Sequence, residues 1–281
     1  MSSGMVINTN ISSINAQRQL TSSNAALSTT MERLSSGLRV NSAKDDAAGL
    51  AIANRMNSQI RGMTVATRNA NDGVSMAQTA EAAMGVMTET MQRMRDLAVQ
   101  ASNTGAVTGE DKDKLQLEFQ QLNDELQRVI TNTEFNGKKI INGSLSGGID
   151  FQVGANTAAD NQIAISVPNL SGTLSEVFLV SIGAGTSTGG GLSAIIALDA
   201  GIKAIDQSRA KLGAVQNRFT TTISNLQSSI ENQAAAKSRI LDADFAAETA
   251  ALSRSQILQQ AGTAMLSQAN QRPQAVMQLL Q

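Results

Sequence analysis

The most regular feature of this sequence is a pair of apolar stripes, one near each end of the chain. Apolar positions are spaced by seven, four, three and four residues in the N-terminal stripe, and by seven, four, seven and four in the C-terminal stripe. These are heptad-type spacings, and a helix with so narrow a stripe needs a partner helix. We therefore expect the two ends to pack on each other and on copies of themselves. The stripes consist of Leu20, Leu27, Met31, Leu34 and Leu38, and of Leu258, Met265, Ala269, Val276 and Leu280.

Two helices are predicted in the N-terminal part of the chain. The first is expected over residues 12–34, and Gly37 marks its end. The second is expected over residues 45–102, where one apolar face persists and no Pro intervenes. If unbroken, it is about 85 Å long at about 1.5 Å per residue, which predicts a rod and no compact domain. The Asn-Asp-Gly sequence at residues 71–73 is the place where it would kink.

The start of the long helix carries a capping signal and two adjacent acidic residues. Ser42 and Asp45 match an S-x-x-D capping box, which places Lys44, Asp45 and Asp46 in the first helical turn. Asp45 and Asp46 could be imagined as a catalytic pair, but adjacent helical side chains point about 100° apart. We interpret the acidic pair as helix-start electrostatics.

Three more helical segments are expected in the rest of the chain. Residues 110–129 carry the cleanest heptad and should pack back antiparallel on the long helix. Helix returns at Ser193 and holds its pattern to Ile230. A last helix is expected from residue 241 to the end, with Pro273 ending or kinking it. The heptad positions of the first of these are Leu115, Phe119, Leu122, Leu126 and Val129.

The middle of the chain changes character from helical to strand-like. Residues 151–153 and 163–167 alternate as strands do, and residues 177–182 are a candidate third strand. Residues 183–191 are rich in Gly and are expected to form a flexible link. This region predicts a small β element inserted between long helices.

Composition narrows the function classes. Aromatic residues make up only 2% of the chain, which favours thin helical packing over a large globular core. The net charge of −1 offers no basic field for nucleic acid or an anionic membrane surface. With no Cys and no His, the chain lacks thiolate chemistry, the usual general base and the commonest metal ligand. We expect no enzyme, no cofactor and no metal site.

Two further patterns could suggest ligand sites. Gly183, Gly185 and Gly189 resemble a dinucleotide-binding turn, but the spacing is wrong and no second βαβ unit follows, so a linker is expected. Methionines recur at helical spacing in the long helix, where core packing is far more common than a metal or ligand groove. These are Met76, Met84, Met87, Met91 and Met94.

Several motifs resemble those of the bacterial flagellin family. The sequence LSSGLRVNSAKDDAAGL at residues 34–50 is similar to the N-terminal family signature. The other matches occur in family order along nearly the whole chain. They lie at residues 71–81, 92–100, 135–137, 151–156, 212–219 and 242–245.

The resemblance implies a mainly α fold, an elongated rod of long antiparallel helices with terminal coiled-coil segments and a small β-hairpin region. Residues 1–42 and 240–281 would form the coiled-coil inner tube of the flagellar filament. Residues 43–167 and 192–239 would form the helical rod with the β-hairpin. Residues 168–191 would be a short variable loop in place of the outer domains of larger members.

The resemblance also implies a location and partners. The subunit would polymerise with itself into the extracellular filament that propels swimming. Export would use the flagellar type III apparatus, and the N-terminal sequence shows no signal peptide that would be cleaved. An export chaperone, the filament cap and the hook–filament junction proteins would be its partners, with no nucleic acid and no membrane.

Host immune receptors are two further implied partners. A vertebrate Toll-like receptor would read Arg93, Leu97 and Glu118. A plant receptor kinase would read a segment around the family signature. The residues of that epitope are Arg33, Leu34, Asn41, Lys44, Asp45, Asp46, Gly49 and Leu50.

Three alternatives are weighed against a plain flagellin. A hook–filament junction protein shares the terminal coils, although the extent of the motif match argues against it. A flagellin carrying an inserted metalloprotease would need an H-E-x-x-H site, which a chain without His lacks. An intracellular coiled-coil adaptor would form no filaments.

Overall fold

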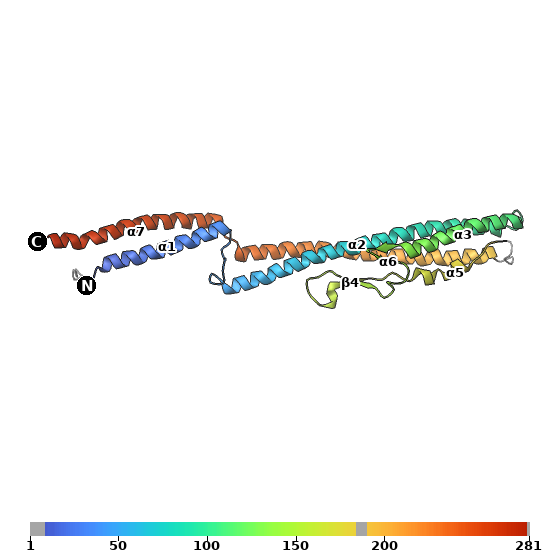
Figure 1. Ribbon diagram of the computed structural model, residues 1–281, viewed down its shortest axis with the longest axis horizontal. Coiled ribbons are helices and arrows are strands. Elements are labelled where there is room, and N and C mark those ends of the chain that lie inside the picture. Colours follow the sequence, from blue (N-terminus) through green and yellow to red (C-terminus); the bar gives the residue numbers. More distant parts are fainter. Residues whose placement is uncertain (1–8, 184–189, 280–281) are drawn as a thin grey trace. The chain divides into compact units, whose positions relative to one another are not determined.

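The computed structural model describes residues 9–183 and 190–279, with side chains through Gln271. Long helices dominate it, and α2 packs antiparallel on α6 as α1 does on α7 (Figure 1), which confirms the mainly α prediction. The helices are α1 Ile11–Ser36, α2 Ala47–Ser102, α3 Gly109–Asn132, α4 Leu170–Thr173, α5 Ser175–Leu179, α6 Gly190–Leu241 and α7 Phe245–Leu279, with a short 3-10 helix η1 Ala159–Asn161. The strands are β1 Glu134–Phe135, β2 Lys138–Lys139, β3 Ile149–Gln152 and β4 Gln162–Ile165.

The chain divides into two compact units. A terminal unit contains Met1–Ser58 and Asn232–Gln281, and a central unit contains Gln59–Glu231. Each unit has its own apolar clusters, so the two are described separately below.

The terminal unit is built on the antiparallel pair α1 and α7. Asn10 donates from its Nδ2 to the carbonyl oxygen of Ala269 at 2.8 Å, near one end of the pair. Arg33 forms an ion pair of 3.6 Å with Glu248 near the other end. Gly37 ends α1 in the left-handed conformation, with φ of 71°, as the sequence predicted.

The segments that follow α1 and α6 lie against each other. The backbone N–H of Arg39 donates to the carbonyl of Leu241 at 2.6 Å, and Leu38 and Asp242 form an antiparallel bridge. A small apolar cluster of Val40, Ala53 and Leu241 lies beside them. Paired backbone and a shared cluster hold the two connections together, although they are some 200 residues apart in sequence.

The capping prediction for α2 was wrong. Asp46, not Ser42, caps the helix, since its Oδ1 accepts from the backbone N–H of Gly49 at 2.8 Å. The carboxylate of Asp45 closes a separate turn by accepting from the N–H of Ser42 at 2.9 Å. Lys44, Asp45 and Asp46 therefore precede the first helical turn, which begins at Ala47.

Helix α2 runs unbroken for 56 residues, about 84 Å at about 1.5 Å per residue. It continues through residues 71–73, where a kink was considered. The reason is tertiary packing, because the ring of the buried Phe219 lies over Gly73. A Cβ at residue 73 would lie 2.7 Å from the Cζ of Phe219, which real Cβ atoms essentially never show.

This contact predicts opposite effects for two alanine substitutions in α2. Gly73→Ala should lower the unfolding free energy by about 1–3 kcal/mol, since the overpacking outweighs any gain in helix propensity. Gly85→Ala should raise it by about 0.5–1 kcal/mol, because nothing lies within 4 Å of its new Cβ. Urea unfolding followed by circular dichroism measures both. Equal stabilisation by the two substitutions would contradict the packing.

The core of the central unit lies where α2, α3 and α6 run side by side (Figure 1). The methionine stripe of α2 is buried there, which confirms its interpretation as core packing. The heptad of α3 also faces this core, with Phe119 and Leu126 fully buried. Phe219 of α6 meets Phe151 of β3 edge to face, with ring centroids 5.9 Å apart.

Two antiparallel hairpins form the β region. Asn136 and Gly137 turn β1 into β2 with φ angles of 50° and 74°, which suit an Asn-Gly turn. In the second hairpin Ile149 pairs with Ile165. The third strand proposed for residues 177–182 was wrong, because α4 and α5 occupy residues 170–179. Short apolar runs fit either period, and here the side chain of Asn169 caps a helical turn by accepting from Gly172.

Two helix boundaries also differ from expectation. Helix α6 begins at Gly190, three residues before Ser193, and of the expected link, residues 184–189 lie outside the described residues. Helix α7 continues past Pro273 to Leu279. Pro273 therefore does not end the helix, although it supplies no N–H donor at this position.

Candidate interaction site

The seam of α1 toward α7 follows a heptad whose positions are partly polar. Ser13, Ser23 and Thr30 are its buried members. Leu20, Leu27 and Leu34 of the predicted stripe are half-buried on the same seam. Met31 lies one residue away from Thr30 and is 55% exposed. The predicted stripe contained all four residues, and the structure places the three leucines on the seam and Met31 off it.

The seam of α7 combines small and polar residues with Leu252 and Leu266, which are half-buried. Ser255 and Ala269 are buried, and Gly262 lies against Leu20 of α1. Leu258 and Met265 of the predicted stripe lie off this seam, with 45% and 66% of their surfaces exposed. Ala269 of that stripe is on the seam. The side chain of Val276 and all of Leu280 lie outside the description.

The polar seam positions have hydrogen-bond partners. The hydroxyl of Ser13 donates to the Oδ1 of Asn270 at 2.8 Å, and that of Thr30 donates to the carbonyl of Ala26 at 2.9 Å. Gln259 donates to the Oδ1 of Asn24 at 2.8 Å. The hydrogen bonds of Ser13 and Gln259 join the two helices, and the leucines of the seam are only half-buried, so the seam stabilises the pair modestly.

Large apolar side chains of α1 and α7 point away from the seam. A monomeric protein seldom exposes many large apolar residues on one pair of helices, and such exposure marks interaction surfaces. Sequence reasoning missed Ile257, because it falls outside the heptad that was counted. We refer to this set as the outer apolar residues, namely Ile11, Ile14, Met31, Ile257, Leu258 and Met265.

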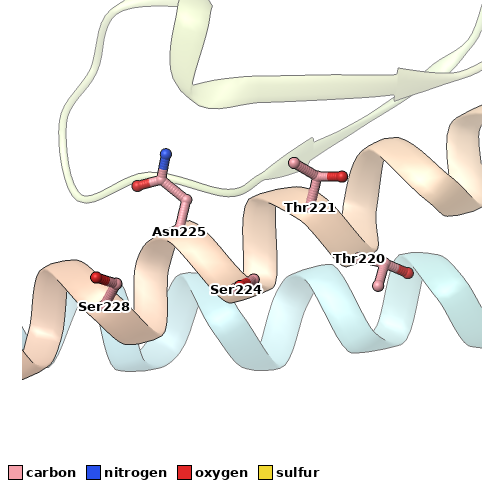
Figure 2. Close-up of a pocket in the computed structure, with 5 residues that line it drawn as sticks. All are labelled: Thr220, Thr221, Ser224, Asn225 and Ser228. Carbon is pink, nitrogen blue, oxygen red and sulfur yellow. The ribbon is translucent and has the colours of Figure 1, made fainter.

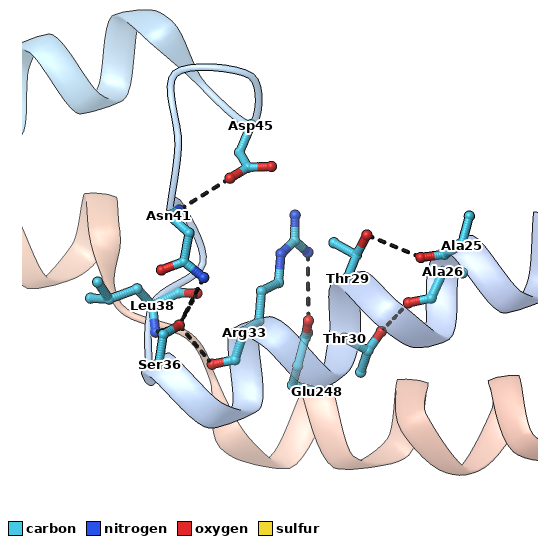
Figure 3. A network of polar contacts seen from close by, with 10 residues as sticks. All are labelled: Ala25, Ala26, Thr29, Thr30, Arg33, Ser36, Leu38, Asn41, Asp45 and Glu248. Carbon is cyan, nitrogen blue, oxygen red and sulfur yellow. Dashed lines mark hydrogen bonds and ion pairs between the residues drawn. The ribbon is translucent and has the colours of Figure 1, made fainter.

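The expected plant-receptor epitope spans the end of α1, the turn after it and the start of α2. Figure 3 shows Arg33 reaching Glu248, and Asn41 joined to Ser36 and to Asp45. Lys44 and Asp45 are exposed, whereas Leu34, Asn41, Asp46 and Leu50 are half-buried. Gly49 is buried, and a Cβ there would meet the carboxylate of Asp46 at 2.3 Å. The structure thus brings the whole epitope together around one polar turn.

The turn holds the pKa of the Asp45 carboxyl below its ordinary value of 3.8. The backbone N–H of Ser42 is the main cause, followed by the Ser42 hydroxyl. Because the folded pKa is the lower one, Asp45 stabilises the fold above about pH 4 and loses this effect as the pH falls through the folded pKa.

A carboxyl titration by NMR tests this effect. The Asp45 midpoint should lie below 3.8, and Ser42→Ala should raise it by removing one donor while the backbone N–H remains. Ser35→Ala, a control at an exposed residue of α1, should leave it unchanged. A midpoint at or above the ordinary value would contradict the turn.

Of the residues expected to meet the Toll-like receptor, two are on the surface and one is buried. The Nε and Nη2 of Arg93 donate to the Oε1 of Glu118 at 2.9 and 2.6 Å, which joins α2 to α3. Both side chains of this ion pair are exposed. Leu97 is only 2% exposed and packs in the central core.

A shallow groove along α6 has no titratable side chain in its lining. It is lined by hydroxyl and amide side chains only (Figure 2). Among residues 9–183 and 190–279, no group of three acidic residues is arranged to hold a metal ion. In the same ranges, no helix combines the length and apolarity that crossing a bilayer requires. The groove residues are Thr220, Thr221, Ser224, Asn225 and Ser228.

Comparison with known proteins identifies the family. The family models for the bacterial flagellin N-terminal and C-terminal helical regions match residues 7–146 and 195–280. A flagellin of Halalkalibacterium halodurans is 44% identical over 276 residues, which cover 98% of this chain and 100% of that protein. The crystal structure of Bacillus cereus flagellin matches with a TM-score of 0.50 and 29% identity, over 60% of this chain and 94% of that one.

A second relative is longer than this chain. Flagellin A of Vibrio cholerae is 38% identical over an alignment of 377 residues, covering 98% of this chain and 99% of that protein. That alignment exceeds the 281 residues of this chain, so the Vibrio protein carries insertions that are absent here. Matches of this extent, at both helical ends, establish that the chain belongs to the bacterial flagellin family, the structural and non-enzymatic subunits of the flagellar filament outside the cell.

Proposed function

We propose that this flagellin polymerises through its outer apolar residues. The observation that carries the proposal is the exposure of Leu258 and Met265 beside an intrachain seam whose leucines are only half-buried. Full burial of one Leu, Ile or Met side chain contributes about 1.5–3 kcal/mol. Burial of the six outer apolar residues against neighbouring copies of the chain therefore provides a driving force for assembly.

The proposal extends to the roles that the family resemblance implies for each part of the chain. Residues 1–42 and 240–281 form the inner tube of the filament, where the terminal helices of neighbouring subunits meet. Residues 43–167 and 192–239 form the helical rod around it, and residues 168–191, which contain the short helices α4 and α5, take the place of the outer domains. The weak intrachain seam supports this division, since α1 and α7 gain most of their burial from neighbours.

The double substitution Leu258→Ser and Met265→Ser tests the assembly surface. It should raise the critical concentration for seeded polymerisation by about tenfold or more, because each 1.4 kcal/mol lost is a factor of about ten. Leu179→Ser is the matched control, since Leu179 is 84% exposed on α5 in the central unit. Sedimentation of polymer after seeding gives both values. An equal change in critical concentration for the two variants would contradict the proposal.

Before assembly, the outer apolar residues are exposed to water unless a partner protein buries them. An export chaperone that binds the C-terminal helix would bury Ile257, Leu258 and Met265 before type III export, which requires no cleaved signal peptide. The filament cap and the hook–filament junction proteins would then offer matching surfaces at the two ends of the polymer.

Recognition by the Toll-like receptor is a second candidate function, favoured by the exposed Arg93–Glu118 pair. The pair offers a receptor one cation and one carboxylate on neighbouring helices, while the buried Leu97 holds α2 in place beneath it. Arg93→Ala should weaken receptor signalling in a reporter assay, whereas Arg128→Ala, in another exposed ion pair of α3, should not. Equal signalling from the two variants would contradict this proposed receptor contact.

Recognition by the plant receptor kinase is proposed for the segment from Arg33 to Ala53. Its exposed members Lys44 and Asp45 support direct contact, and its polar turn supports a defined shape.

A further inference from the structure

Two sets of methionines in this chain differ sharply in solvent access, and Met56, half-buried, and Met63, buried in a separate cluster, belong to neither. Within the described side chains, the methionines of the α2 core have almost no exposed surface. Met31 on α1 and Met265 on α7 are mostly exposed, and both belong to the outer apolar residues. The buried group is Met76, Met84, Met87, Met91 and Met94.

Solvent access decides which thioether meets an oxidant. A peroxide needs direct approach to the sulfur, so the core sulfurs are protected by packing while Met31 and Met265 are open. The thioether sulfur attacks one peroxide oxygen, the O–O bond breaks, and an S–O bond forms. The sulfur is oxidised by two electrons, and the peroxide is reduced to water.

The product has a different surface chemistry. Methionine sulfoxide is polar, so it removes the apolar character that Met31 and Met265 contribute to the outer apolar residues. We infer that Met31 and Met265 form an oxidation-sensitive site through which peroxide-class oxidants block polymerisation of the free subunit. This inference rests on the proposed assembly function, because it needs both side chains to be buried in the filament.

The site should therefore differ between subunit and polymer. In the free subunit both sulfurs react, and oxidised subunits fail to add to a filament. In the filament both sulfurs are covered by neighbouring copies, so the assembled polymer resists the same treatment. Oxidants would lower the concentration of subunits that can assemble and leave the finished filament intact.

Peptide mass spectrometry of the full chain after hydrogen peroxide treatment is the first test. In the subunit, Met31 and Met265 should convert to sulfoxide well before Met84 and Met91. Equal conversion of the four residues would overturn the inference. In the polymer, conversion at Met31 and Met265 should slow by about tenfold or more, as expected for buried thioethers. Unchanged conversion there would instead refute the proposed assembly surface.

Seeded polymerisation of the peroxide-treated subunit is the second test. Its critical concentration should rise by about tenfold, a change equivalent to about 1.4 kcal/mol. The variant Met31→Leu with Met265→Leu keeps apolar volume, so it should polymerise normally and stay within about twofold after peroxide. Equal loss of assembly in both proteins would overturn the inference. It would leave the proposed function standing if the Leu258→Ser and Met265→Ser variant still fails to assemble.

Discussion

Deletion of residues 245–281 is expected to abolish filament formation while the central unit stays folded. The deletion removes α7, and with it Ile257, Leu258 and Met265 of the outer apolar residues. It also leaves α1 without its partner helix, and most helical stability in proteins comes from such tertiary packing. Negative-stain electron microscopy after seeding with a precipitating salt should show long filaments from the full chain and none from the truncated one.

The control for this deletion is the fold of the rest of the protein. Circular dichroism of the truncated chain should keep a cooperative thermal transition, because the core between α2, α3 and α6 lies within Gln59–Glu231. Normal filaments from the truncated chain would show that α7 is dispensable and would remove the assembly surface proposed for it.

Phe219→Ala is expected to be the most damaging single substitution in the central unit, lowering the unfolding free energy by about 3–5 kcal/mol. The Phe219 ring is fully buried, lies over Gly73 of α2 and meets Phe151 edge to face. Its removal opens a cavity between α2, α6 and the β3–β4 hairpin. Urea unfolding followed by circular dichroism measures the change.

Phe245→Ala is the matched control, because it removes the same side chain from a position that is 61% exposed. It should change stability by less than about 1 kcal/mol, since surface substitutions usually have effects within about 0.5 kcal/mol. Similar losses for the two variants would mean that the Phe219 contacts are not the centre of this core.

The heptad analysis found the right helices and part of the right register. Leu20, Leu27 and Leu34 lie on the α1 seam as predicted. Counting large apolar residues nevertheless put Met31 on the seam, where Thr30 is buried instead. The buried Ser and Thr positions of the seam carry no hydropathy signal, so sequence periodicity finds such a helix pair more easily than its exact inner and outer faces.

The local differences have equally specific causes. The S-x-x-D motif at Ser42 fits both a helix cap and a turn, and the competing side chain of Asp46 makes the cap. The Asn-Asp-Gly sequence of α2 stays helical because Phe219 packs over Gly73, a contact from a helix more than 100 residues away. Leu97 matches the family motif, yet its burial follows from packing that the motif does not encode.

The family resemblance supplied what periodicity could not, namely the filament and its location outside the cell. The motif match extends over both helical ends, and the family models match the same regions.

Hydrogen exchange on the subunit and on the filament tests the central claim, that the terminal helices gain most of their burial from neighbouring copies. Amides of α1 and α7 should exchange rapidly in the subunit and become strongly protected in the filament, while those of α2 between Met76 and Ala101 stay protected in both. Full protection of α1 and α7 in the free subunit would contradict the claim, because the pair would then be stable without assembly.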